Sequence, residues 1–193
     1  PKYYDKINLP EDSELRRSVV ITNPLGEDTS VMRTTCVPSM LEVIARNYNN
    51  RNLAGRLYEM GKVYLPKETP DILPDERAVA VVGTFGDKED FFALKGILNE
   101  VFEKLGVLGV EYSALRTDPA FHPGRCAAVW SGDTRLGTLG QIHPDVCAAY
   151  GLDGATYCAE IDVVLLHDLE GAEPVYTPLP RFPAITRDIA VVC

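Results

Sequence analysis

Two His-Cys pairs are the clearest candidates for chemistry in this sequence. His122 and Cys126 lie in HPGRC, and His143 and Cys147 lie in HPDVC, so each histidine is followed by a cysteine four residues later. Four nitrogen and sulfur ligands suit tetrahedral zinc. Only the second pair fits one helical turn, however, because a Pro-Gly step interrupts the first. We therefore treat zinc as the minor alternative and favour buried or hydrogen-bonded structural roles for these side chains.

Other reactive groups offer weaker signals. The five cysteines form no CxxC pair, which favours reduced thiols in a cytoplasmic protein over a disulfide framework, and nothing indicates which thiol would be activated. Four carboxylates fall on expected strands, where they would make a candidate catalytic set: Glu59, Glu160, Asp162 and Asp188. Solvent-facing or salt-bridged positions are favoured for them, because exposed faces of antiparallel strands are usually polar.

A β-hairpin is expected to carry both histidines. Residues 121–144 show near-alternating apolar positions on either side of a turn at 131–133, and a His-Pro corner bounds each end. Glycines at 137 and 140 indicate close backbone approach or a bulge.

The remaining elements predict a mixed fold. Hydrophobic spacing predicts helices over residues 38–48, from 88 or 90 to 105, and over 145–150. Further strands are expected at 17–22, 57–65, 77–85, 110–116 and 156–164. Most strands follow one another without regular helix alternation. The pattern therefore predicts an α+β fold, with one largely antiparallel sheet flanked by helices.

Composition limits the classes of partner. The net charge of −9, from 28 acidic and 19 basic residues, argues against a module that grips a phosphate backbone by itself. Arg46, Arg51 and Arg56 are candidates for tRNA contact, although solvated helix ends explain them more simply. No apolar run approaches the ~20 residues that span a bilayer, so no membrane association is expected. The absence of an initiator Met and a last strand that stops abruptly suggest a piece of a longer protein.

Several distinctive strings appear in the order of a known family. They are Asn23-Pro24-Leu25, Met32-Arg33-Thr34-Thr35, Tyr58-Glu59-Met60-Gly61, FHPGRCA from residue 121, GTLGQIHP from residue 137 and LPRFPAITRDIAVV from residue 179. Through them the chain resembles the β subunit of bacterial-type phenylalanine–tRNA ligase, in its catalytic-like module, over about residues 20–193. Gly26, Cys126 and Gln141 depart mildly from that pattern. The motif positions carried by the resemblance are Pro24, Arg33, Glu59, Gly61, His122, Pro123, Gly124, Arg125, Gly140, His143 and Pro144.

The resemblance implies both an architecture and an assembly. It implies a class II synthetase-like module over residues 1–173, followed over 174–193 by a linker and the first strand of a truncated ferredoxin-like anticodon-binding domain. It also implies that ATP and Mg belong to the holoenzyme, with no cofactor in this fragment. The module would pair with a catalytic α subunit in an (αβ)₂ heterotetramer, and tRNA would be contacted mainly by other domains.

The same resemblance implies that the module is inactive alone. Active class II domains hold ATP phosphate with an arginine of their second motif and an arginine-bearing helix of their third. Here the second-motif-like strand LYEMGKVYLP leads into residues 66–76, which offer Lys67 but no arginine, and Gly151 and Gly154 precede no glycine–arginine helix start. Charge developing on phosphate would lack positioned cations. The alternative reading is a free-standing His/Cys metalloprotein or hydrolase.

Overall fold

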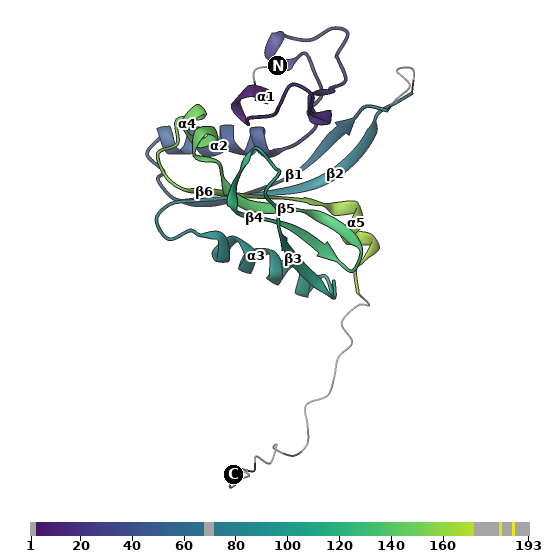
Figure 1. The fold of residues 1–193 in the computed structure, drawn as a ribbon, viewed down its shortest axis with the longest axis vertical. Coiled ribbons are helices and arrows are strands. Elements are labelled where there is room, and N and C mark those ends of the chain that lie inside the picture. Colours follow the sequence, from purple (N-terminus) through teal and green to yellow (C-terminus); the bar gives the residue numbers. More distant parts are fainter. Residues whose placement is uncertain (1–2, 68–71, 172–181, 183–186, 188–193) are drawn as a thin grey trace.

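The computed structural model describes residues 3–67, 72–171, 182 and 187 (Figure 1). Its centre is a six-stranded, fully antiparallel sheet with strand order β1-β2-β6-β5-β4-β3. The strands are β1 (Gly55–Leu65), β2 (Asp75–Phe85), β3 (Val110–Ala114), β4 (Phe121–Ser131), β5 (Thr134–Ile142) and β6 (Thr156–Asp162). The α+β prediction of an antiparallel sheet flanked by helices is confirmed.

Helices cover both faces of this sheet (Figure 1). One face packs against α2 (Val37–Asn49), α4 (Pro144–Ala149) and the N-terminal segment with α1 (Tyr3–Lys6). The opposite face packs against α3 (Phe91–Lys104) and α5 (Val163–Asp168). Two short 3-10 helices, Glu14–Arg16 and Glu27–Thr29, interrupt the segment that precedes α2. No helix in the described ranges has both the length and the apolar character needed to cross a bilayer.

The expected helices form where local signals begin and end them. Asp90 caps α3 by accepting a hydrogen bond from the amide of Ala93 at 2.6 Å, and Gly106 follows the helix with a φ of +68°. Leu94, Leu98 and Phe102 form its buried stripe. The apolar residues at 101 and 105 are exposed, because the sheet covers only a narrow strip of the helix.

The hairpin prediction is confirmed. Strands β4 and β5 pair around a turn that contains Gly132 at a φ of +55°, and the register shifts between Phe121 and Cys126 and again between Val129 and Trp130. Gly137 and Gly140 lie where the strands approach most closely. A Cβ at Gly137 would collide with the backbone of β6, and one at Gly140 would lie 2.8 Å from the carbonyl oxygen of Arg125. Both glycines are therefore required by backbone approach, as expected.

Two local expectations are wrong. Residues 17–22 form no strand, because their pairing is limited to an isolated bridge between Val20 and Val31. The strand expected to reach residue 164 stops at Asp162, whose side chain accepts from the amides of Val164 and Leu165 and so begins α5. Met40 of α2 is buried against the sheet, since Gly83 on β2 leaves room for its side chain.

Candidate functional site

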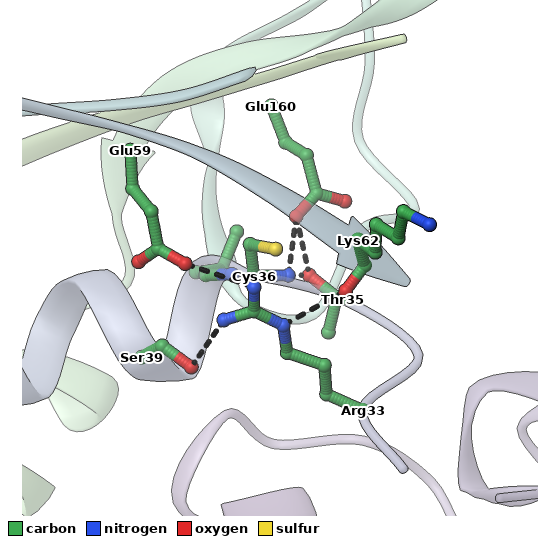
Figure 2. Close-up of polar contacts among 8 residues, drawn as sticks. Arg33, Thr35, Cys36, Ser39, Glu59, Lys62 and Glu160 are labelled. Atoms are coloured by element: carbon green, nitrogen blue, oxygen red, sulfur yellow. Dashed lines mark hydrogen bonds and ion pairs between the residues drawn. The ribbon is translucent and has the colours of Figure 1, made fainter. Parts of the chain in front are cut away.

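The guanidinium group of Arg33 joins the start of α2 to the edge strand β1. Its Nε donates to the carbonyl oxygen of Lys62 at 2.9 Å, Nη1 donates to Oγ of Ser39 at 3.2 Å, and Nη2 forms an ion pair with Oε1 of Glu59 at 2.8 Å (Figure 2). All three donor nitrogens are therefore used. Because the planar guanidinium group fixes the directions of its donors, this contact links the start of α2 to β1 in one defined orientation.

Gly61 makes this arrangement sterically possible. A Cβ on Gly61 would overlap Nη2 of Arg33 and would lie 3.0 Å from both the Cys36 sulfur and Oε1 of Glu59. The two family strings that contain Arg33 and Glu59-Met60-Gly61 thus meet in space, although they are 26 residues apart. Their shared role here is structural.

Glu160 makes a second connection, between β6 and the start of α2. One of its carboxylate oxygens, Oε2, accepts hydrogen bonds from the hydroxyl group of Thr35 at 3.0 Å and from the backbone amide of Cys36 (Figure 2). Burial raises the pKa of this carboxyl group above its usual value, and the two hydrogen bonds only partly oppose that effect. A solvent-facing or salt-bridged position was expected for Glu160, and that expectation is wrong.

A cavity of about 360 Å³ lies beside this connection, on the α2 face of the sheet. Its apolar lining comes from the N-terminal segment, α2 and the sheet. Five charged side chains also line it: Arg77, Asp118, Arg135, Glu160 and Asp162. Such a mixture of apolar walls and a few polar groups is typical of small-ligand sites. Arg77, Asp118 and Arg135 carried no signal as site residues in the sequence, because they come from three separate segments.

The two arginines of the cavity are already engaged. Nε of Arg77 donates to Oδ2 of Asp75 at 2.7 Å, and Nη2 of Arg135 donates to Oγ1 of Thr138 at 2.9 Å. Each arginine uses one nitrogen in these bonds, and the cavity is lined by three carboxylates and these two arginines. This balance of charge disfavours a phosphate group.

The candidate zinc residues are not assembled into a metal site. Nδ1 of His122 accepts from the amide of Gly124 at 3.1 Å, and Nδ1 of His143 accepts from the amide of Asp145 at 3.2 Å. Cys126 and Cys147 are buried in the core on the α2 face. Across the ranges that the structure describes, no three His, Cys, Asp or Glu side chains gather closely enough to hold a metal ion. Each histidine thus accepts a hydrogen bond from the backbone just after its own proline.

The thiols are also poor candidates for a nucleophile. The four described cysteines are free and buried. Burial raises the pKa of the Cys36 and Cys126 thiols to about 12 and also raises the pKa of Cys147 and Cys158. Because the thiolate is the reactive form, these groups have little nucleophilic character near neutral pH.

The other motif positions have local roles. Pro123 and Gly124 lie in the exposed bulge that interrupts β4, and Arg125 donates to the Gln141 side chain at 2.7 Å. Pro144 begins α4 next to His143, and Pro24 lies in an exposed loop before α2. Asp188 lies outside the described residues. So do the linker and strand expected over 174–193, apart from residues 182 and 187.

The candidate tRNA-contacting arginines are spread over the end of α2 and the start of β1. Arg46 is exposed near the C-terminus of α2, and Arg51 follows it with a φ of +66°. Nε of Arg56, on β1, forms an ion pair with Glu89 at 2.9 Å. Nothing in this arrangement distinguishes a tRNA contact from ordinary surface charge.

Comparison with known proteins decides the family. The family model described as the CLM domain of the phenylalanyl-tRNA synthetase β chain matches residues 1–163. The chain belongs to the phenylalanyl-tRNA synthetase β-chain family. This β-chain module is 48% identical to the phenylalanine–tRNA ligase β subunit of Clostridium acetobutylicum and 44% identical to that of Clostridium tetani, in both cases over all of its own length. It spans 24% of the length of each of these relatives.

Solved structures show the same fold for the β-chain module. It superposes on pyrrolysyl-tRNA synthetase from Desulfitobacterium hafniense with a TM-score of 0.68 and 15% sequence identity, covering 86% of this chain and 57% of that one. A second structure from the same organism, PylSc, gives a TM-score of 0.63 over 79% of this chain and 52% of that one, at 14% identity. The fold is therefore that of a class II aminoacyl-tRNA synthetase domain.

Proposed function

We propose that this chain is the non-catalytic, synthetase-like module of a phenylalanine–tRNA ligase β subunit. It supports the ATP-dependent attachment of phenylalanine to tRNA by pairing with the catalytic α subunit. The observation that carries the proposal is the 48% identity to such a β subunit over the whole chain.

The chemistry of the sheet face supports the non-catalytic part of the proposal. Residues 66–76 contain no arginine, and no glycine–arginine helix start follows Gly151 and Gly154. The carboxylates of Asp118, Glu160 and Asp162 outnumber the arginines in the neighbouring cavity. Phosphoryl chemistry needs positioned cations at the developing negative charge, so this face is poorly suited to ATP.

The finer parts of the proposal concern the whole enzyme. The α subunit supplies the working site with ATP and Mg, and two αβ pairs form the (αβ)₂ heterotetramer in the cytoplasm. Contact with tRNA is made mainly by other domains of the β subunit. Residues 174–193 are the linker and the first strand of the anticodon-binding domain.

Pyrophosphate exchange tests this function directly. The purified chain is incubated with phenylalanine, ATP and radiolabelled pyrophosphate, both alone and as part of a complete β subunit reconstituted with its α subunit. We expect no exchange from the chain alone and robust exchange from the reconstituted enzyme. The α subunit should also co-purify with the complete β subunit.

A single substitution tests whether this module takes part in the reaction or only binds the α subunit. Lys67 is the one cation in the second-motif-like loop, so Lys67→Ala in the complete β subunit should leave exchange by the reconstituted enzyme unchanged. Exchange by the isolated chain, or loss of exchange in the Lys67→Ala enzyme with the α subunit still bound, would contradict the non-catalytic role.

A further inference from the structure

The cavity on the α2 face contains two carboxyl groups that keep unused hydrogen-bonding capacity. Oε2 of Glu160 accepts from Thr35 and Cys36, while Oε1 is turned away from both donors (Figure 2). Oδ1 of Asp118 accepts from the amide of Ala120 at 3.1 Å. Within the described ranges, no donor bonds to Oε1 of Glu160 or to Oδ2 of Asp118. Both residues line the same cavity, and each keeps one carboxyl oxygen that accepts no hydrogen bond from the described residues.

The charge of the pair favours a positively charged ligand. Asp118 and Glu160 are both half-buried. Burial raises the pKa of each carboxyl group, and the negative charge of Asp118 adds to the rise for Glu160. Arg33 and Arg135 act in the opposite direction but more weakly. Two partly desolvated carboxylates without a full cationic partner are costly, and a bound cation would remove that cost.

The small number of free acceptor oxygens in the cavity favours an organic ammonium group over a metal ion. A calcium or magnesium site usually needs several oxygen ligands in a closed shell. In the described part of the chain, no three acidic, His or Cys side chains lie close enough together to hold a metal ion. An ammonium group, by contrast, carries three N–H donors and needs only a few acceptors. The free oxygens of Asp118 and Glu160 supply two of these acceptors.

The remaining walls favour an apolar body on the ligand. Ile7, Leu9 and Leu15 of the N-terminal segment line the cavity together with Phe121 and Leu136 of the hairpin. The volume of about 360 Å³ falls in the range of small-molecule pockets. We propose that this cavity binds a small primary amine, with its ammonium group between Glu160 and Asp118 and its hydrocarbon chain against these apolar residues.

A set of three isosteric probes tests the proposal on the whole 193-residue chain. Isoamylamine, isoamyl alcohol and isovalerate share one branched skeleton and carry a positive charge, no charge and a negative charge. Binding is followed by NMR from the backbone amide shifts of Thr35, Ala120 and Thr138, which line the cavity. We expect the amine to bind with a dissociation constant of about 1 mM or lower, and the other two probes to bind at least about tenfold more weakly.

Three variants locate the charge that the amine recognises. Glu160→Gln and Asp118→Asn keep the size of each side chain and remove its charge, so each should weaken amine binding by about tenfold. Glu100→Gln removes an equivalent charge from an exposed position on α3 and should have no effect. It controls for general attraction of cations to a chain with a net charge of −9.

Each outcome decides the proposal. Selective amine binding that is lost in the two cavity variants and kept in Glu100→Gln supports it. Equal binding of amine and alcohol, undiminished binding in folded Asp118→Asn, or no amine binding overturns it. Should Glu160→Gln fail to fold, Asp118→Asn decides alone, because the Asp118 carboxylate makes no hydrogen bond to Thr35 or Cys36.

Discussion

Glu160 shows how one ionisable side chain can make the stability of this fold depend on pH. Its carboxyl group anchors the first residues of α2 to β6 while it is largely removed from water. Burial favours the neutral acid, so the folded state holds a proton on Glu160 more tightly than the unfolded chain does. The negative charge of Asp118 acts in the same direction, and Arg33 acts against it.

The raised pKa of Glu160 makes the fold less stable as the pH rises. A carboxyl group whose pKa is raised by folding contributes stability that is fully present below its ordinary pKa of 4.5 and is lost as the pH rises through the raised value. Relative to the wild-type chain, Glu160→Gln should therefore gain stability between pH 4.5 and pH 7, by at most about 1.4 kcal/mol per pH unit.

Urea denaturation at several pH values measures that difference in the free energy of unfolding. The exposed Glu100→Gln variant should show no comparable pH-dependent gain over the wild type. A constant difference between Glu160→Gln and the wild type at all pH values would show that folding leaves the pKa of Glu160 unchanged.

At the scale of elements, the contact between the segment before α2 and strand β1 rests on one arginine. Arg33 uses three nitrogens to bind Lys62, Ser39 and Glu59, and it crosses β1 directly over Gly61. The strand therefore needs a residue without a side chain at this point. This explains why a glycine, normally unfavourable within a strand, is placed in the middle of β1.

Replacing Gly61 with alanine should displace the Arg33 side chain. The added Cβ overlaps Nη2 of Arg33 and crowds the Cys36 sulfur, so we expect Gly61→Ala to destabilise the fold by about 2 kcal/mol. Gly96→Ala is the matched control, since a Cβ at Gly96 in α3 meets nothing within 4 Å. That control should instead stabilise the chain by about 0.5 to 1 kcal/mol. Equal effects of the two substitutions in urea denaturation would rule out the steric explanation.

At the scale of the whole molecule, the net negative charge governs association with tRNA. The chain carries 28 acidic and 19 basic residues, and one of the three candidate arginines, Arg56, is paired with Glu89. Binding to a phosphate backbone draws its free energy mainly from released counterions, which requires a basic surface. This module is acidic overall, with a net charge of −9.

We therefore expect the isolated chain to bind tRNA only weakly, with a dissociation constant above about 100 µM near 150 mM salt. Substituting Arg46, Arg51 and Arg56 together with alanine should leave that affinity unchanged in a filter-binding assay. Tight binding whose dependence on salt becomes less steep in the triple variant would instead establish a direct tRNA contact through these residues.

The elements of this fold were largely predictable from local sequence, because their signals lie within a few residues of each other. The apolar stripe of α3, the glycine after it and the turn of the β4–β5 hairpin each depend on short-range periodicity or backbone conformation. The strand expected at residues 17–22 failed because strand formation needs a partner, and here the pairing is limited to a single bridge. The helix at residues 163–168 was missed because its apolar residues also suit a strand.

The sequence by itself therefore determined the family, the antiparallel sheet and the glycines at which backbones approach. Only the tertiary structure decided which charged groups share a cavity and which are withdrawn from water. Asp118 and Glu160 are 42 residues apart in the sequence, and Thr35 is 125 residues from the carboxylate that it binds. Burial and electrostatic coupling depend on distances between such remote segments, and local patterns of residues carry no information about those distances.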